Sequence, residues 1–177
     1  EIAPVLQPNS IIINKSTVPL GTAKKIQETL TKTEAHVVSN PEFLSEGNAI
    51  NDFLKPSRIV IGASSKEHAE RVSKLYSDID APILLCSRES AELIKHTANA
   101  FLAMKLTFVN EIATFCEMTG ADIEDVTSGI GYDPRIGADY MRAGPGWGGS
   151  CFPKDSASLA YVARSAGFDF TLLEHII

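Results

Sequence analysis

Cysteine is scarce in this sequence, and the few cysteines present are widely spaced. The 177 residues include three, Cys86, Cys116 and Cys151. An odd number at this spacing excludes a closed disulfide framework and a C-x-x-C zinc site. The four histidines also lack metal-ligand spacing, so we expect no metal. Unpaired thiols suit the reducing cytosol, and we therefore expect a cytoplasmic protein.

Basic residues and long apolar runs are also lacking. There are 22 acidic and 16 basic residues, a formal net charge of -6, and no long basic run. A nucleic-acid or anionic-membrane surface would require the opposite sign of charge. No stretch approaches the roughly 18 apolar residues of a membrane span. We therefore expect neither a nucleic-acid partner nor a membrane partner.

The first half of the chain alternates short apolar runs with helical patterns. The apolar runs lie at residues 10–14, 36–39, 58–62 and 82–86. Helical patterns occupy about 22–30 and 67–76, and a polar loop with helical pieces follows the second run. Strands separated by helices of this length favour a mainly parallel sheet. We expect residues 1–86 to form an α/β domain.

The second half changes character at residue 87. Residues 87–119 contain no proline and no glycine, and their apolar positions recur with helical spacing. A helix of this length would measure about 50 Å, so we expect it to join two domains or form an oligomer interface. Eight of the twelve glycines lie between positions 120 and 149, and further helices are expected from about 153 to 166 and from 171 onward. The predicted fold is α/β followed by all-α.

A glycine-rich loop leads into a cysteine at the start of a predicted helix. Four of the six residues 144–149 are glycine, which lets the backbone approach a ligand closely. Pro153 suits the first turn of a helix, so Cys151 lies just ahead of a helix N-terminus. The helix dipole and nearby Lys154 both favour the reactive thiolate. The alternative is an inert buried cysteine, which is how we interpret Cys86 and Cys116.

Polar residues on the long helix and after the strands form a second group of candidates. Lys95 and Asn99 are four residues apart, so they share one helix face, and their small or apolar neighbours indicate that this face is not in bulk water. A solvated polar stripe is the alternative. Glu42 and Glu46 follow the second strand, where they are either general bases or surface charges. Ser16 and Thr17 follow the first strand, as ligand contacts or as a helix cap.

Four collinear motifs carry a family resemblance. Residues 16–19, 40–47, Lys95-x-x-x-Asn99 and 144–155 together resemble the nucleotide-sugar 6-dehydrogenases, most closely the branch that acts on UDP-glucose. The string Gly-Gly-Ser-Cys-Phe-Pro-Lys-Asp is the most specific of the four. The resemblance implies that residues 1–86 are the C-terminal part of a Rossmann-like NAD-binding domain. Residues 87–177 would be the connecting helix and a central helical dimerisation domain.

The same resemblance accounts for a missing phosphate-binding motif. No G-x-G-x-x-G follows a strand here, although family members carry one in the first half of the NAD domain. They also carry a second nucleotide-binding domain after the central one. We therefore expect this chain to be a fragment that does not turn over substrate alone.

The family oxidises the C6 alcohol of a nucleotide sugar to a carboxylate with two NAD⁺. By resemblance, Cys151 is the nucleophile that forms a thiohemiacetal and then a thioester, and Lys95 stabilises the oxyanion. Asn99 holds a water or the same oxygen, Glu42 is the base for thioester hydrolysis, and Thr17 and Asp155 order the adjoining groups.

The resemblance also implies binding residues and a partner. Those expected near NAD are Ser16, Thr17, Glu46 and Lys154. Those expected near UDP-glucose are Phe43, Leu44, Lys95, Asn99, Arg135, Arg142, Gly144, Gly146 and Gly148. The expected partner is a second copy of the chain, bound through the 87–119 helix.

Three alternatives remain at this stage. A sister enzyme would apply the same chemistry to GDP-mannose or a UDP-N-acetylhexosamine. A non-catalytic assembly module would dimerise through the long helix. A hydroxyacid or phosphogluconate-type dehydrogenase is disfavoured because its reaction needs no cysteine nucleophile.

Overall fold

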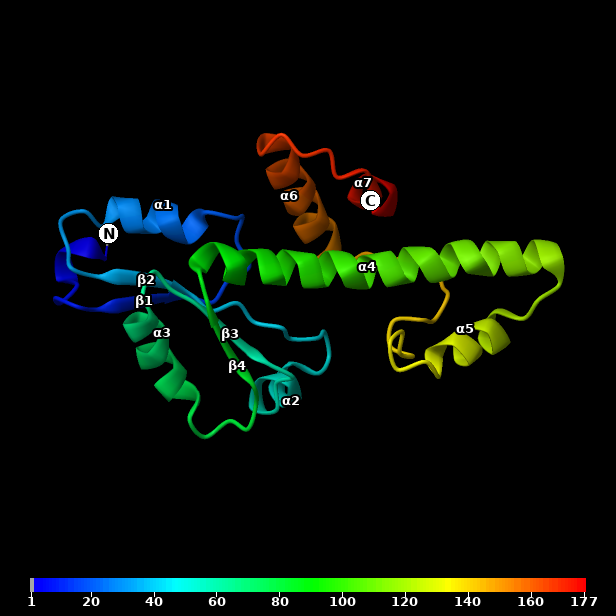
Figure 1. Ribbon diagram of the computed structural model, residues 1–177, viewed down its shortest axis with the longest axis horizontal. Helices are drawn as coiled ribbons and strands as arrows, with labels where there is room; N and C mark the ends of the chain where they lie inside the picture. Colours follow the sequence, from blue (N-terminus) through cyan, green and yellow to red (C-terminus); the bar gives the residue numbers. More distant parts are fainter. Residues whose placement is uncertain (1) are drawn as a thin grey trace. The chain divides into compact units, whose positions relative to one another are not determined.

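A four-stranded sheet and one 32-residue helix organise the chain, as seen in the computed structural model, which describes residues 2–177 (Figure 1). The chain divides into two compact units, Glu1–Lys95 and His96–Ile177. The division falls within the long helix α4 (Arg88–Thr119), so its first two turns belong to the first unit.

The sheet of the first unit has the order β1-β2-β3-β4. Each predicted strand is present, and the bounds differ from the prediction by at most one residue. The strands are β1 (Ile11–Asn14), β2 (His36–Ser39), β3 (Ile59–Gly62) and β4 (Ile83–Cys86). β1 pairs with β2, and β3 with β4, in parallel, which agrees with the predicted parallel-dominated sheet.

One pairing differs from a fully parallel sheet, because β2 and β3 are antiparallel through Ser39 and Gly62. A parallel neighbour requires a crossover that carries the chain back across a sheet face. The link between β2 and β3 contains only the six-residue helix α2 (Ala49–Leu54). The chain therefore re-enters the sheet from the edge at which β2 ends.

Helices cover the two faces of this sheet. Val37 packs with residues of α1 (Thr22–Thr29), whereas Val38 packs with residues of α3 (Lys66–Ser73). The two valines face opposite ways because successive side chains of a strand alternate. The short 3-10 helices Ala3–Val5 and Lys74–Tyr76 complete the unit.

The second unit is all-helical, as predicted. It contains the rest of α4 with α5 (Ile123–Gly131), α6 (Phe152–Ser165) and α7 (Thr171–Ile176) (Figure 1). Gly120, with φ +75°, follows the end of α4 in the left-handed conformation that favours glycine. Its core cluster joins α4, α6 and α7 through Ala100, Leu159, Ala160 and Leu173.

Aromatic side chains remain exposed along α4. Phe101, Phe108 and Phe115 are 56%, 52% and 60% exposed. Their seven-residue spacing places them on one helix face. No helix among residues 2–177 has the length and apolar character to cross a membrane. Over the same residues, no three His, Cys, Asp or Glu side chains gather as a metal site would require.

Candidate functional site

The carboxyl ends of β1 and β2 bring several predicted residues to one edge of the first unit. Asn14 and Ser39 end the two strands and lie opposite each other in the parallel register. The segments that follow, with Ser16 and Thr17 on one side and Glu42 on the other, therefore start side by side. Ligands of α/β proteins commonly bind at this edge.

Lys95 and Glu42 meet at this edge. The Lys95 Nζ lies 3.7 Å from Glu42 Oε1, and the two side chains are 6% and 33% exposed. The Lys95 ammonium also lies 5.3 Å from the ring centroid of Phe43. The other Glu42 oxygen accepts the backbone N–H of Leu44 at 2.7 Å. An almost buried cation is thus held beside a carboxylate that water can still reach.

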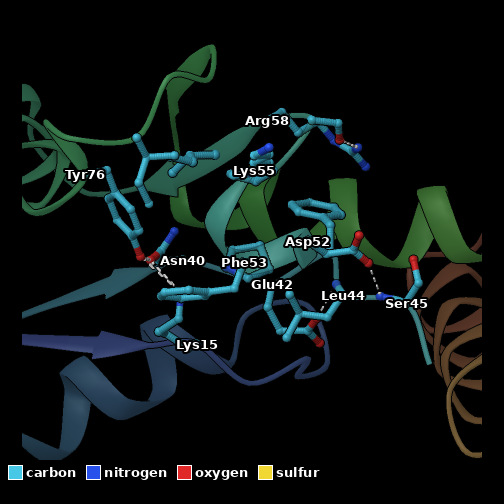
Figure 2. A pocket seen from close by; sticks show the side chains of 16 residues that line it. Lys15, Asn40, Glu42, Leu44, Ser45, Asp52, Phe53, Lys55, Arg58 and Tyr76 are labelled. Atoms are coloured by element: carbon cyan, nitrogen blue, oxygen red, sulfur yellow. Dashed lines mark hydrogen bonds between the residues drawn. The ribbon is translucent and has the colours of Figure 1, made fainter. Parts of the chain in front are cut away.

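A cavity of about 290 Å³ adjoins the Glu42 loop (Figure 2). Its polar and aromatic lining includes Lys15, Asn40, Glu42, Phe43, Arg58 and Tyr76. The Arg58 guanidinium carbon lies 3.9 Å from the Phe43 ring centroid, and burial lowers the pKa of Arg58. Two cations therefore lie near the Phe43 ring: Arg58, which immediately precedes β3, and Lys95 of α4.

A buried amide holds the start of the same loop. Asn40 Nδ2 donates to the carbonyl of Val60 at 2.8 Å. Its Oδ1 accepts Lys15 Nζ at 3.0 Å and the Tyr76 hydroxyl, as Figure 2 shows. Because these partners come from three separate segments, Asn40 fixes where the loop leaves β2.

A second, much smaller cavity lies between this edge and α4. Its volume is about 10 Å³, and its lining includes Ser16, Thr17, Ser39, Glu92 and Lys95. Nearby, the buried Nδ2 of Asn14 has no hydrogen-bond partner in the structure. A free donor at this edge fits the polar groups of a dinucleotide, although the glycine motif that would hold its pyrophosphate is absent from these residues.

Cys151 is the exposed residue immediately before α6 in the second unit. Its carbonyl accepts the Asp155 N–H at 2.9 Å, so the first helical turn begins there. The Ser150 hydroxyl lies 3.7 Å from its Sγ. This confirms the predicted place of Cys151 at a helix N-terminus, where the dipole favours a negative charge.

A buried carboxylate stands one turn further along α6. Asp155 is fully buried, and its Oδ2 accepts Asn99 Nδ2 at 2.6 Å. Its other oxygen forms an ion pair with Lys154. Asn99 on α4 and Asp155 on α6 are therefore linked within the unit. Lys95 and Asn99 are both buried, as their apolar surroundings predicted.

Two hydrogen bonds tie the glycine-rich loop to α4. The Gly144 N–H donates to Asn110 Oδ1 at 2.9 Å, and Trp147 Nε1 donates to Thr107 Oγ1 at 2.8 Å. The two acceptors are three residues apart and share one face of the helix. Between them Gly146 adopts a φ of +114°, which a larger residue would rarely accept.

The remaining predicted residues lie on the surface of their units. Arg135 is exposed and binds Asp133 through Nε at 3.0 Å and a terminal nitrogen at 2.6 Å. These bonds raise the pKa of Arg135 and lower that of Asp133. The other exposed members are Ser16, Leu44, Glu46, Arg142, Gly144, Gly146, Gly148 and Lys154.

Sequence reasoning missed two residues at this site. Glu92 lies three positions before Lys95 on the same helix face, and this spacing could have identified it from the sequence. Arg58 offered no local signal, because its approach to Phe43 depends on the antiparallel return of β3. Asn40 belongs to the predicted motif at residues 40–47, but its hydrogen bonds to three separate segments were not predicted.

Comparisons with known proteins agree over most of the chain. Residues 1–80 match the NAD binding domain of the UDP-glucose/GDP-mannose dehydrogenase family, and residues 89–177 match its central domain. The UDP-glucose 6-dehydrogenase TuaD of Bacillus subtilis is 48% identical in an alignment of 172 residues that covers 94% of this chain and 37% of that protein.

Solved structures of nucleotide-sugar dehydrogenases also resemble the chain. A UDP-glucose dehydrogenase from Pyrobaculum islandicum superposes with a TM-score of 0.88 and 40% identity, over 94% of this chain and 40% of that one. A UDP-D-ManNAc dehydrogenase from Pyrococcus horikoshii gives 0.85 and 27%, over 99% and 42%. The chain therefore spans about two fifths of the length of the proteins it matches.

Proposed function

The chain belongs to the UDP-glucose/GDP-mannose dehydrogenase family, and on that premise we propose that it is the central part of an NAD-dependent UDP-glucose 6-dehydrogenase. The observation that carries the proposal is Cys151, exposed at the head of α6 and one helical turn before the buried Asp155. A reactive thiol at that place suits an oxidation that passes through a covalent acyl intermediate.

In the proposed reaction, Cys151 is the residue bonded to the sugar. Its Sγ adds to the C6 aldehyde formed by the first oxidation and gives a thiohemiacetal. Loss of a hydride from this adduct gives a thioester, and water then breaks the C–S bond to release the carboxylate and the thiol. NAD⁺, when bound, is the acceptor of the hydride in each of the two oxidations.

Lys95 and Glu42 supply charge and proton transfer in this proposal. The buried Lys95 ammonium stabilises the negative charge that develops on the C6 oxygen, where a preorganised charge is most effective. Glu42 accepts the proton of the water that attacks the thioester. Thr17 and Asp155 order the groups around that water, and Asn99 holds it or the C6 oxygen.

The proposal also assigns residues that bind NAD and residues that bind the nucleotide sugar. We place NAD near Ser16, Thr17 and Glu46, which follow β1 and β2 at the edge where Asn14 Nδ2 has no hydrogen-bond partner. Lys154, at the start of α6, is placed near NAD on family membership alone. We place the nucleotide sugar against Phe43 and Leu44, Arg135, Arg142 and the glycine-rich loop at Gly144, Gly146 and Gly148. The tethering of that loop to α4 supports a fixed binding surface.

We further propose a homodimer formed through α4, in the cytoplasm. The support is the exposed face of Phe101, Phe108 and Phe115, since a contiguous apolar stripe is typical of an interface. In this arrangement residues 1–86 are the NAD-domain part and residues 87–177 the dimerisation part. Residues 1–177 alone are proposed to be inactive, because they lack a pyrophosphate cradle.

The test is NADH formation by the full-length protein that contains this chain, with UDP-glucose, GDP-mannose and UDP-N-acetylglucosamine in parallel. We expect two NADH per UDP-glucose, abolished in Cys151→Ala and retained in the control Cys86→Ala. Turnover of another nucleotide sugar alone would move the substrate but keep the mechanism. Turnover that survives Cys151→Ala would refute the covalent route.

A further inference from the structure

Glu92 is a buried carboxylate whose hydrogen-bond donors carry no charge. It is 4% exposed, and it accepts the backbone N–H groups of Gly21 and Ala23 at 2.6 and 2.8 Å. The Ser39 hydroxyl donates to it at 3.4 Å. A buried charge is costly unless polar groups replace its water. Three donors from two separate segments do so here.

These donors show that Glu92 caps a helix to which it does not belong. Gly21 is the N-cap residue of α1, with φ +85°, and it has no side chain to accept the free N–H groups of the first turn. The oxygens of Glu92 take that place from α4. The positive end of the α1 dipole further favours the carboxylate.

Glu92 is also one helical turn from Lys95. The two residues are three positions apart on α4 and line the same 10 Å³ cavity with Ser16 and Thr17. Through its hydrogen bonds, Glu92 connects the start of α4 to the start of α1 and the end of β2. These connections lie next to the Lys95 side chain. A shift of α4 along the sheet would have to break these hydrogen bonds.

We propose that Glu92 is a positioning residue: by capping α1 it sets the place of α4 on the sheet, and thereby the distance of Lys95 from Glu42. Its effect on catalysis rests on the proposed function, whereas its effect on geometry does not. Small displacements of a reacting group can lower a rate by about 100-fold. The role therefore predicts a loss of kcat together with a local loosening of the start of α1.

The test compares Glu92→Gln with a matched cap variant, Asp122→Asn, in the full-length protein. Asp122 likewise caps a helix with its carboxylate, accepting the N–H of Glu124 and Asp125 at the start of α5. In Glu92→Gln the amide keeps one acceptor but turns an NH₂ toward a backbone N–H. We expect faster amide hydrogen exchange at Gly21 and Ala23 and a kcat reduced by about 10- to 100-fold, with KM changed less than threefold.

The control should show faster exchange at Glu124 and Asp125 with wild-type kcat. Faster exchange at Gly21 with wild-type kcat in Glu92→Gln would make Glu92 a structural cap only. Should that variant fail to fold, Glu92→Asp, which keeps the charge on a shorter side chain, takes its place with the same expectations.

An independent measurement separates this proposal from the proposed function. A crystal structure of the Glu92→Gln protein should show Lys95 Nζ displaced from its 3.7 Å distance to Glu42. An unchanged distance would overturn the positioning role whether or not the protein is a dehydrogenase. If the wild type oxidises no nucleotide sugar, the proposed function fails while this distance still decides the role of Glu92.

Discussion

The Lys95 ammonium lies 3.7 Å from the Glu42 carboxylate, although one comes from α4 and the other from the loop after β2. Lys95 is almost fully buried, whereas a third of the Glu42 side chain is exposed. The pair therefore holds the Lys95 side chain inside the protein and leaves the Glu42 carboxylate accessible to water. This asymmetry suits an oxyanion-stabilising lysine beside a general base.

Lys95→Met removes this cation and keeps an unbranched side chain that is one atom shorter. We expect kcat to fall by about 10²- to 10³-fold, the usual effect of removing a preorganised group that stabilises an oxyanion. Glu42 remains partly solvated, so the fold should survive. Steady-state NADH formation in the full-length protein measures the effect. The matched change Lys24→Met, at an exposed lysine of α1, should leave kcat unaltered; a Lys95→Met enzyme within twofold of wild type would contradict the role.

Phe108→Glu places a charge in the middle of the exposed α4 face. If that face is the dimer interface, burying the new carboxylate would be costly, and the dimer should dissociate to a monomer. Size-exclusion chromatography with light scattering reports the mass directly. Tyr161→Glu, at a 68% exposed aromatic residue of α6, is the control and should not change the mass. An unchanged mass in Phe108→Glu would exclude an interface centred on this residue.

Gly62→Ala should destabilise the first unit. An added Cβ would lie 2.5 Å from Ala91 Cβ and 2.6 Å from the carbonyl oxygen of Ser87. Because one of these neighbours is backbone, we expect a loss of roughly 1–3 kcal/mol in the free energy of unfolding, as for other overpacked sites. Urea unfolding measures it.

Gly129→Ala is the matched control for this change. Gly129 lies within α5, and an added Cβ there meets nothing within 4 Å. Alanine is the better helix former, so a gain of roughly 0.5–1 kcal/mol is expected. Equal effects of the two changes would show that the close approach of α4 to β3 does not constrain residue 62.

The stacked pair His36 and His68 should make stability fall in mild acid. Their ring centroids lie 3.7 Å apart. Burial first, and then the charge of His36, lower the pKa of His68 below its value in an unfolded chain. The unfolded state therefore binds the proton more readily, and the stabilisation present above about pH 6.5 is lost as the pH falls through the folded pKa.

We therefore expect the midpoint temperature of thermal unfolding to fall as the pH is lowered from about 7 to about 5.5, a range that contains the ordinary histidine pKa of about 6.5. The fall should be smaller in His68→Gln, which cannot titrate. A variant with the same pH dependence as wild type would assign the loss to other groups.

Much of the architecture was predictable because it depends on local chemistry. The β-branched run before Asn14 identified β1, and the absence of proline and glycine from 87 to 119 identified α4. Pro153 after a glycine-rich loop located the N-terminus of α6 and therefore Cys151. The direction of β3 was not predictable in the same way, because strand propensity is the same for parallel and antiparallel neighbours.

The sequence by itself determined where most strands and helices lie and which of them carry the motif residues. Local propensity and spacing suffice for these features, since each depends on residues that are close along the chain. The family resemblance came instead from four motifs taken together, between residues 16 and 155. Only the tertiary structure decided that Lys95 pairs with Glu42, that Asn99 bonds to Asp155 and that Glu92 caps α1. Each of these contacts joins segments distant in sequence, and such contacts form only when helices and strands pack to bury apolar surface.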